Sequence, residues 1–151
     1  MSSPLTNPER RDLAAIAATM IPADKALGMP AADDPAILAD IERSIGRDLA
    51  AVRETLAAIA AAANGKFATL DIDRREVLVT ERLAVGGWPA WLFGRLVLAA
   101  YYRDDRVLRA LGHEARAPFP KGYVLEQGDW SLLDPVRDRA PLWRDDRKGA
   151  R

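Results

Sequence analysis

The sequence predicts an all-α protein, a compact bundle of about five to six helices with a long irregular C-terminal tail. Apolar residues recur at helical spacing in several segments, and capping residues, Pro and Gly separate these segments. No segment alternates apolar and polar residues as a half-buried strand does. We expect a helical domain over residues 1–112. The tail over residues 113–151 either belongs to the same domain or wraps around a partner.

The predicted helices begin and end at residues that commonly occupy helix termini. Caps and first-turn prolines mark their starts at Asn7-Pro8, Asp34-Pro35, Asp71, Pro89 and Asp104. Prolines and glycines mark their ends at Pro22, Gly46, Asn64-Gly65, Gly86-Gly87 and Gly112. The first helix is therefore expected over about residues 8–21.

Apolar spacing also predicts which side of each helix is buried. The most regular stripe consists of Leu49, Val52, Leu56 and Ile59. The segment that follows Gly86-Gly87 is expected to be the central and most buried helix, with its inward side formed by Trp88, Trp91, Leu92, Leu96 and Ala99. Gly94 within that segment indicates that another backbone approaches closely. In the preceding helix, we expect Val77 and Leu78 to face inward.

Composition excludes several classes of function. The chain of 151 residues has 22 Lys and Arg against 22 Asp and Glu, so its net charge attracts neither nucleic acid nor an anionic membrane surface. It has no Cys, which excludes a disulfide, a thiolate nucleophile and a Cys-based zinc or iron–sulfur site. Apolar runs are too short for a membrane span. We expect no cofactor or metal in this chain.

Candidate catalytic residues are few. His113 is the only histidine, and it follows a predicted helix end, where such a residue is commonly a partner of the helix dipole. Adjacent aspartates such as Asp104 and Asp105 are explained by capping at a helix start. Trp88, Trp91 and the Tyr101-Tyr102 pair allow a ligand pocket, but helical spacing favours a place in the core. We therefore expect no catalytic residue.

The tail carries more aromatic residues than a disordered segment normally does. Its anchors are Pro118, Phe119, Pro120, Tyr123, Trp130 and Trp143. Aromatic residues and arginines dominate protein interfaces, yet the same tail is able to pack on the helices of its own chain. Composition alone leaves both alternatives open.

Two segments, "LAAIAATMIPADKALGMPAA" and "AYYRDDRVLRALGHEARAPFPKGY", resemble the gluconate 2-dehydrogenase subunit 3 family. The first segment is similar to the family's opening, in which an apolar helix runs into an Ile-Pro-Ala-Asp turn followed by Gly and Pro. The second segment is similar to its later signature, with a Tyr pair, an acidic helix start, an Ala-Leu-Gly exit and a Pro-rich run to Gly-Tyr. His113 and Glu114 depart from the family, whose members tend to have an aromatic residue there.

The resemblance implies a non-catalytic small subunit that binds and stabilises a large oxidoreductase of the glucose-methanol-choline type. That partner holds FAD and oxidises a sugar, a sugar acid or a glycoside, and in some complexes an electron-transfer protein such as a cytochrome subunit is a further partner. Many relatives have a twin-arginine leader, whereas here the similarity begins close to Met1, so we expect a cytoplasmic complex. A missing leader, or one supplied by the partner, would instead make the complex periplasmic or exported.

These observations lead to three hypotheses. The first is the accessory subunit, whose expected interface residues are Pro22, Asp24, His113, Pro118, Phe119, Tyr123, Trp130, Leu132, Leu133 and Trp143. The second is a stand-alone helical protein-binding module with a self-packed tail. The third, a small enzyme that uses His113 with a carboxylate, has the least support because no nucleophile accompanies the histidine.

Overall fold

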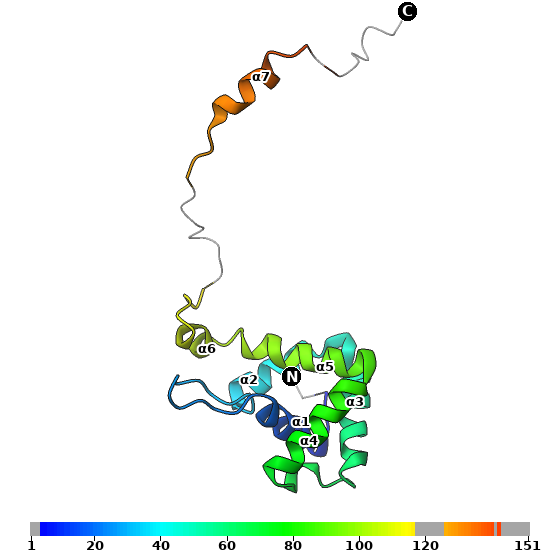
Figure 1. The fold of residues 1–151 in the computed structure, drawn as a ribbon. Coiled ribbons are helices and arrows are strands. Elements are labelled where there is room, and N and C mark those ends of the chain that lie inside the picture. Colours follow the sequence, from blue (N-terminus) through cyan, green and yellow to red (C-terminus); the bar gives the residue numbers. More distant parts are fainter. Residues whose placement is uncertain (1–3, 117–125, 141, 143–151) are drawn as a thin grey trace, which may run out of the picture. The chain divides into compact units, whose positions relative to one another are not determined.

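The computed structural model of the chain describes residues 4–116, 126–140 and 142. The chain divides into two compact units, Met1–Arg116 and Ala117–Arg151, each described here by itself. The first unit is a bundle of six α-helices (Figure 1). The described residues contain one isolated β-bridge, between Asp24 and Met29, and no strand. The predicted all-α fold class is confirmed.

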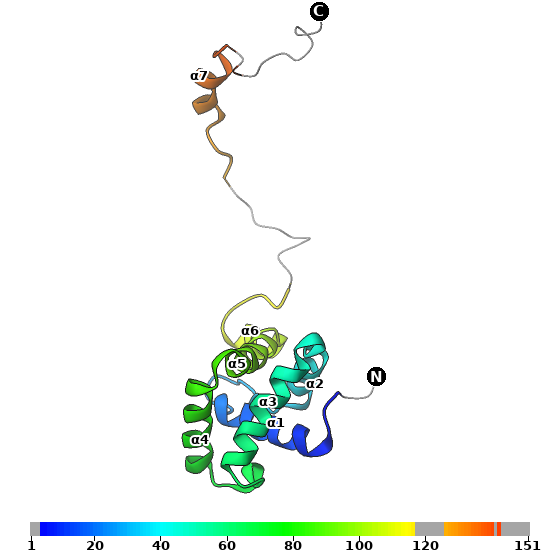
Figure 2. The same cartoon turned by 90° about the vertical axis from the view of Figure 1, so that its right-hand side faces the viewer.

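The helices of the first unit are joined by loops, the longest of which runs from residue 21 to residue 34, and by two 3-10 turns. Its α-helices are α1 (Asn7–Met20), α2 (Pro35–Ser44), α3 (Leu49–Ala62), α4 (Ile72–Val85), α5 (Gly87–Tyr101) and α6 (Asp105–Ala110). The 3-10 turns are η1 (Gly46–Asp48) and η2 (Phe67–Thr69). α5 and α6 lie along one side of this unit in both views (Figure 1; Figure 2).

Helix α1 begins one residue earlier than predicted. Its cap is Thr6, not Asn7, because the Thr6 hydroxyl accepts a hydrogen bond from the Glu9 N–H while the Glu9 carboxylate accepts one from the Thr6 N–H, 2.7 Å away. This reciprocal capping box satisfies two N–H groups that the helix itself leaves unpaired. The hydrogen bond from the Thr6 backbone lowers the pKa of Glu9.

The other predicted aspartate caps are confirmed. Asp34, Asp71 and Asp104 precede α2, α4 and α6, and each side chain accepts a hydrogen bond from a first-turn N–H. These carboxylates also complement the positive end of the helix dipole. The local sequence signals therefore predicted the starts of α2, α4 and α6 correctly.

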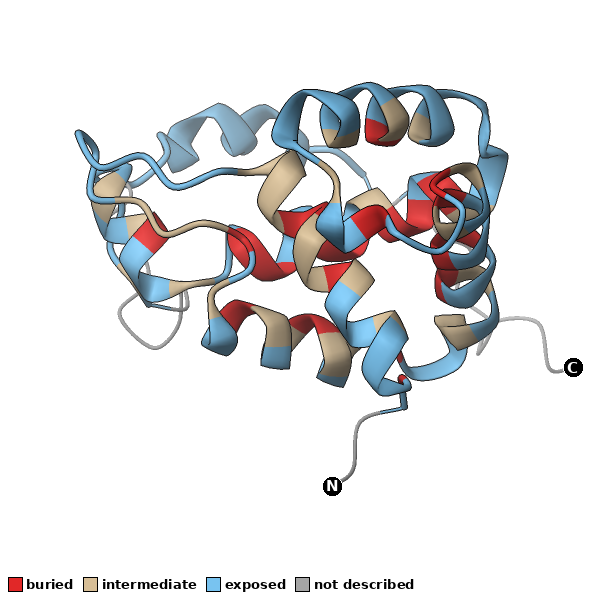
Figure 3. Cartoon of the chain, turned by 90° about the horizontal axis from the view of Figure 1, so that it is seen from below, coloured by how far each residue is buried: buried red, intermediate tan, exposed pale blue. Residues whose placement is uncertain are grey.

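The core lies where the six helices face one another, and their outer sides are exposed (Figure 3). The predicted α3 stripe is confirmed, since Val52, Leu56 and Ile59 are buried and Leu49 is partly buried. α5 packs against α2, α3 and α4 and contributes the most buried residues of any helix. Its buried side consists of Ala90, Leu92, Phe93, Leu96, Val97, Ala100 and Tyr101.

Four residues that were predicted to face inward are exposed. Trp88 and Trp91 are 66% and 55% exposed, and Ala99 is also exposed, because the buried side of α5 centres on Phe93 and Val97, about half a turn away. Val77 of α4 is exposed as well, since α4 turns Val79 to the core.

The expectation about Gly94 is also wrong for this chain. A Cβ atom added to Gly94 would meet no atom within 4 Å, so no backbone of the described residues approaches it. The close approach occurs instead at Gly86, between α4 and α5. A Cβ atom there would lie 2.5 Å from the Ala90 Cβ and 2.8 Å from the Arg82 carbonyl oxygen.

The second unit carries short helical turns in a tail that was predicted to be irregular. These are η3 (Trp130–Leu133) and α7 (Asp134–Arg137). The Asp129 carboxylate caps them by accepting a hydrogen bond from the Ser131 N–H at 3.0 Å. All described residues of this unit are exposed.

Candidate protein-binding surface

The outer side of α5 carries exposed large side chains in a row. They are three or four residues apart and therefore lie along one face of the helix. We call this row the α5 strip, which consists of Trp88, Trp91, Arg95, Leu98 and Tyr102. Soluble monomers rarely expose apolar side chains of this size side by side, so such a strip indicates an interaction site.

Contacts within the α5 strip hold its aromatic rings in place. The rings of Trp88 and Trp91 stack with their centroids 4.7 Å apart and their planes 23° apart. The guanidinium carbon of Arg95 lies over the Trp91 ring, 5.8 Å from its centroid, in a cation–π contact. Tyr102 meets the buried Tyr101 edge to face at 5.3 Å. Rings that are already ordered lose less conformational freedom when a partner binds.

A shallow groove of about 660 Å³ runs beside the α5 strip. Met20 of α1 and Leu83 of α4 form its far side, while Gly94 and Ala99 of α5 contribute little side-chain bulk. The groove is lined almost entirely by apolar atoms, with Arg95 its one charged residue. Its shape and chemistry suit an elongated apolar element of another protein.

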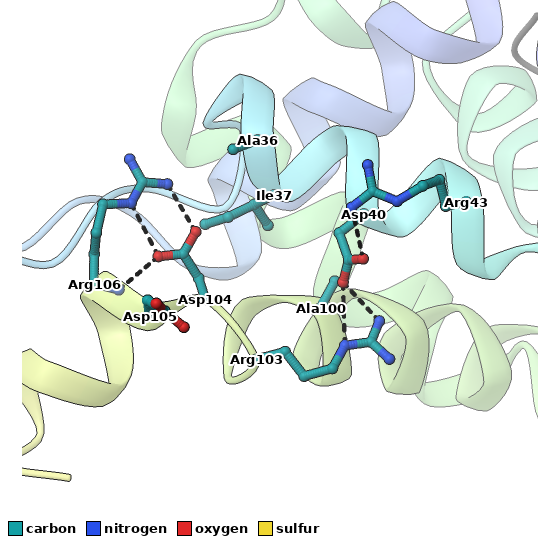
Figure 4. A pocket seen from close by; sticks show the side chains of 9 residues that line it. All are labelled: Ala36, Ile37, Asp40, Arg43, Ala100, Arg103, Asp104, Asp105 and Arg106. Carbon is teal, nitrogen blue, oxygen red and sulfur yellow. Dashed lines mark hydrogen bonds and ion pairs between the residues drawn. The ribbon is translucent and has the colours of Figure 1, made fainter. Parts of the chain in front are cut away.

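A second groove, of about 500 Å³, lies between α2 and the turn that joins α5 to α6 (Figure 4). Arg103 donates to the Asp40 carboxylate at 2.7 Å, and Arg106 donates to those of Asp34 and Asp104 at 2.8 and 2.9 Å. These hydrogen bonds from Arg106 lower the pKa of Asp34 to about 2 and also lower the pKa of Asp104.

The carboxylates of Asp34 and Asp104 are therefore held ionised by their pairing with Arg106. A group that acts as a general acid or base near neutral pH needs a pKa near neutrality, whereas these pKa values move away from it. Since Asp34 caps α2 and Asp104 caps α6, Arg106 ties two helix starts together. This arrangement of hydrogen bonds indicates a structural role, in which Arg106 holds the starts of α2 and α6 together.

The predicted interface residues Pro22 and Asp24 lie in the loop that follows α1. The Asp24 carboxylate accepts hydrogen bonds from the N–H groups of Ala26 and Leu27, at 2.8 and 3.1 Å. Asp24 also exchanges two backbone hydrogen bonds with Met29. The loop is therefore closed on itself, and it presents Leu27 to solvent.

The other predicted site residues lie in different places. His113 is exposed just after α6, and its N–H donates to the Leu108 carbonyl at 2.8 Å. No described hydrogen bond joins His113 to the Asp24 loop. Four more of the predicted interface residues lie outside the described residues, and these are Pro118, Phe119, Tyr123 and Trp143.

The apolar residues of η3 and α7 in the described part of the tail are exposed. Trp130 and Leu133 are three residues apart and Leu132 and Val136 are four apart, spacings that make each pair neighbours along a helical segment. Trp130 is 62% exposed and Leu132 is 74% exposed. The predicted interface residues Trp130, Leu132 and Leu133 are therefore all exposed on this short helical segment.

Sequence reasoning weighed the aromatic residues of the α5 strip but assigned them to the core. A signal for their exposure was present, because the segment from Gly87 to Tyr102 is apolar on nearly every side. A helix at the edge of a small bundle buries only one of its sides. An all-round apolar helix of this kind thus leaves a second apolar side for another molecule.

No group of three or more potential metal ligands comes together within residues 4–116, 126–140 and 142. In the same residues, no helix has the length and apolar character that a membrane span requires. The fold and its surface define a small all-α protein with one ordered, exposed aromatic strip. No family model, curated protein or solved structure matches the chain. The resemblance to the gluconate 2-dehydrogenase subunit 3 family stays a prediction.

Proposed function

We propose that this chain is a non-catalytic small subunit that binds and stabilises a large FAD-dependent oxidoreductase chain of the glucose-methanol-choline type. The observation that carries the proposal is the α5 strip, with two stacked, exposed tryptophans beside an apolar groove. Tryptophan is the residue type most enriched among the side chains that dominate binding energy. The nature of the partner rests on the sequence resemblance.

Burial of the α5 strip supplies a driving force for binding. Trp88 and Trp91 are each more than half exposed, so covering each ring contributes roughly 1 to 2 kcal/mol from the apolar area removed from water. The exposed side of η3 and α7 adds a second apolar surface centred on Trp130. Two surfaces on one chain raise the overall affinity, because the second contact forms within an existing complex.

The proposed action of the subunit is thermodynamic. A subunit that binds only the folded partner stabilises it by an amount that grows with the subunit's free concentration relative to Kd. In the proposal, FAD and the sugar or glycoside substrate belong to the partner chain, and an electron-transfer protein joins some assemblies. A cytoplasmic location is part of the same proposal.

Affinity purification of the full-length tagged chain from its native cells tests this function. The expected result is one co-purifying large chain whose absorption spectrum has the visible bands of oxidised flavin, and which oxidises a sugar or glycoside. Trp91→Ser should reduce recovery of that chain at least tenfold. Val77→Ser on α4 is the matched control, because Val77 is equally exposed but lies outside the α5 strip.

Two results would contradict the proposal. A co-purifying chain without flavin would show that the subunit serves another class of partner. A lone monomer, whose tail resists protease when the chain is expressed by itself, would favour the stand-alone module with a self-packed tail.

A further inference from the structure

The spacing of the α5 strip identifies the kind of element that covers it, an inference that rests on the proposed function. Trp88, Trp91, Arg95, Leu98 and Tyr102 are separated in turn by three, four, three and four residues. This is the spacing of the a and d positions of a heptad, whose side chains pack between those of a second helix at a shallow crossing angle. We propose that the α5 strip binds an α-helix of the partner chain, and that this helix carries a carboxylate opposite Arg95.

Arg95 places a positive charge in the middle of the apolar α5 strip. It occupies the middle position of the α5 strip, and its described contact is with the ring of Trp91. No carboxylate of the described residues pairs with it. A guanidinium enclosed in an apolar interface without a counter-charge is strongly unfavourable, so the covering helix has to supply an Asp or Glu. One charged pair within an apolar seam also sets the register of the two helices.

The same position argues against a second copy of this chain as the occupant. In a two-fold antiparallel pair of α5 strips, no carboxylate lies opposite Arg95, because the strip itself contains none. In a parallel pair, equivalent a positions meet, so the two Arg95 side chains face each other. Like charges brought together in this way disfavour association. Charge complementarity therefore selects a different chain.

Gly94 fits the same arrangement. A glycine inside a helix costs about 0.5 to 1 kcal/mol relative to alanine, and no atom of the described residues needs the space beside it. Gly94 lines the groove next to Arg95. The missing side chain allows the covering helix to approach α5 closely at the position of the charged pair.

Carbodiimide cross-linking of the purified complex tests the inference directly. Arg95→Lys keeps the positive charge and adds a primary amine that carbodiimide joins to a carboxylate in contact with it. The expected product links position 95 to an Asp or Glu of the partner, in a segment with apolar residues three or four positions to either side. Arg74→Lys, at an exposed position of α4, is the matched control and should give no such link.

Charge reversal provides the second measurement. Arg95→Glu should weaken the complex at least tenfold, Arg95→Lys and Arg74→Glu should leave it near wild type, and reversing the partner's cross-linked carboxylate to Lys should restore binding to Arg95→Glu. Circular dichroism checks that each variant keeps its helices.

The outcomes separate this inference from the proposed function. A flavoprotein that binds Arg95→Glu as tightly as wild type would overturn the inference alone. A link from position 95 to a second copy, or to the tail of the same chain, would also overturn it. A flavin-free partner that shows the predicted link and charge dependence would overturn the function alone. If no chain co-purifies, both fail.

Discussion

The phenolic hydroxyl of Tyr101 donates a hydrogen bond to the backbone carbonyl oxygen of Pro30, 3.0 Å away, although the two residues are 71 positions apart. Tyr101 is 1% exposed, and its burial raises the pKa of the phenol. The bond joins the end of α5 to the loop that Asp24 closes. Tyr102, the next residue, is exposed and ends the α5 strip. Adjacent tyrosines thus hold the loop and form the exposed surface.

Tyr101→Phe should destabilise the first unit by about 1 to 2 kcal/mol, because it leaves the partly buried Pro30 carbonyl without its donor. Hydrogen exchange should also become faster in the loop from Asp24 to Met29. Urea unfolding and exchange mass spectrometry measure the two effects. Tyr102→Phe is the control and should change neither, so equal behaviour of the two variants would contradict the assigned role.

Asp34→Asn should lower stability by about 1 to 2 kcal/mol near neutral pH, because it removes the ion pair with Arg106 while Asn still caps α2. The pKa of Asp34 in the folded state is about 2, below its ordinary 3.8, so its contribution is complete above pH 3.8 and is lost as the pH falls toward 2. The difference from wild type should therefore shrink at acid pH.

Urea unfolding at about pH 6 and about pH 3 gives the measurement for Asp34→Asn. Asp105→Asn is a suitable control, because its pair with Arg109 lies on an exposed helix face and contributes little. A difference between Asp34→Asn and wild type that stays constant with pH would show that the stabilisation does not come from the charge.

Substituting alanine for each of two glycines should change the stability of the chain in opposite directions. Gly94→Ala should stabilise the isolated chain by about 0.5 to 1 kcal/mol, since its Cβ meets open space within a helix. Gly86→Ala should destabilise it by about 1 to 3 kcal/mol, because its Cβ would lie 2.8 Å from the Arg82 carbonyl oxygen of the backbone. Thermal unfolding of both variants decides the point, and a loss of stability in Gly94→Ala would mean that its surroundings are filled.

Truncation after Arg116 should leave the helical unit folded, with its unfolding free energy within about 0.5 kcal/mol of the full chain. The reason is that the core residues lie between Leu5 and Val107. Binding to the flavoprotein should weaken at least tenfold, because the surface around Trp130 is removed. Circular dichroism and titration with the purified partner measure the two quantities. Undiminished binding would show that the tail contributes nothing to the interface.

The sequence predicted helix starts and the α3 stripe because these depend on neighbours a few residues away. A capping aspartate acts on the next turn, and an apolar stripe needs only the regular geometry of one helix. The first cap shows the limit of this reasoning, because Asn7 was predicted to cap α1 whereas Thr6 does so in the structure. Both residues cap well, and the choice depended on Glu9 lying three residues after Thr6.

Fewer features of the candidate binding surface could be predicted from the sequence. Asp24 was expected at a partner interface, and that stays a prediction; the structure shows that its carboxylate closes the loop by accepting hydrogen bonds from N–H groups two and three residues ahead. Trp88 and Trp91 were placed in the core because their spacing is helical, yet spacing shows which residues share a face and not which face is covered. Whether His113 and the tail anchors contact a partner stays a prediction.

By itself, the sequence determined that this protein is a bundle of capped helices, since helix formation follows from short-range hydrogen bonds and periodic apolar residues. Only the tertiary structure decided which side of α5 is buried. That helix is apolar nearly all round, and α2, α3 and α4 cover the side that carries Phe93 and Val97. No neighbour within the described helical unit covers Trp88 and Trp91 fully, because a small bundle has too few helices to enclose every side of α5.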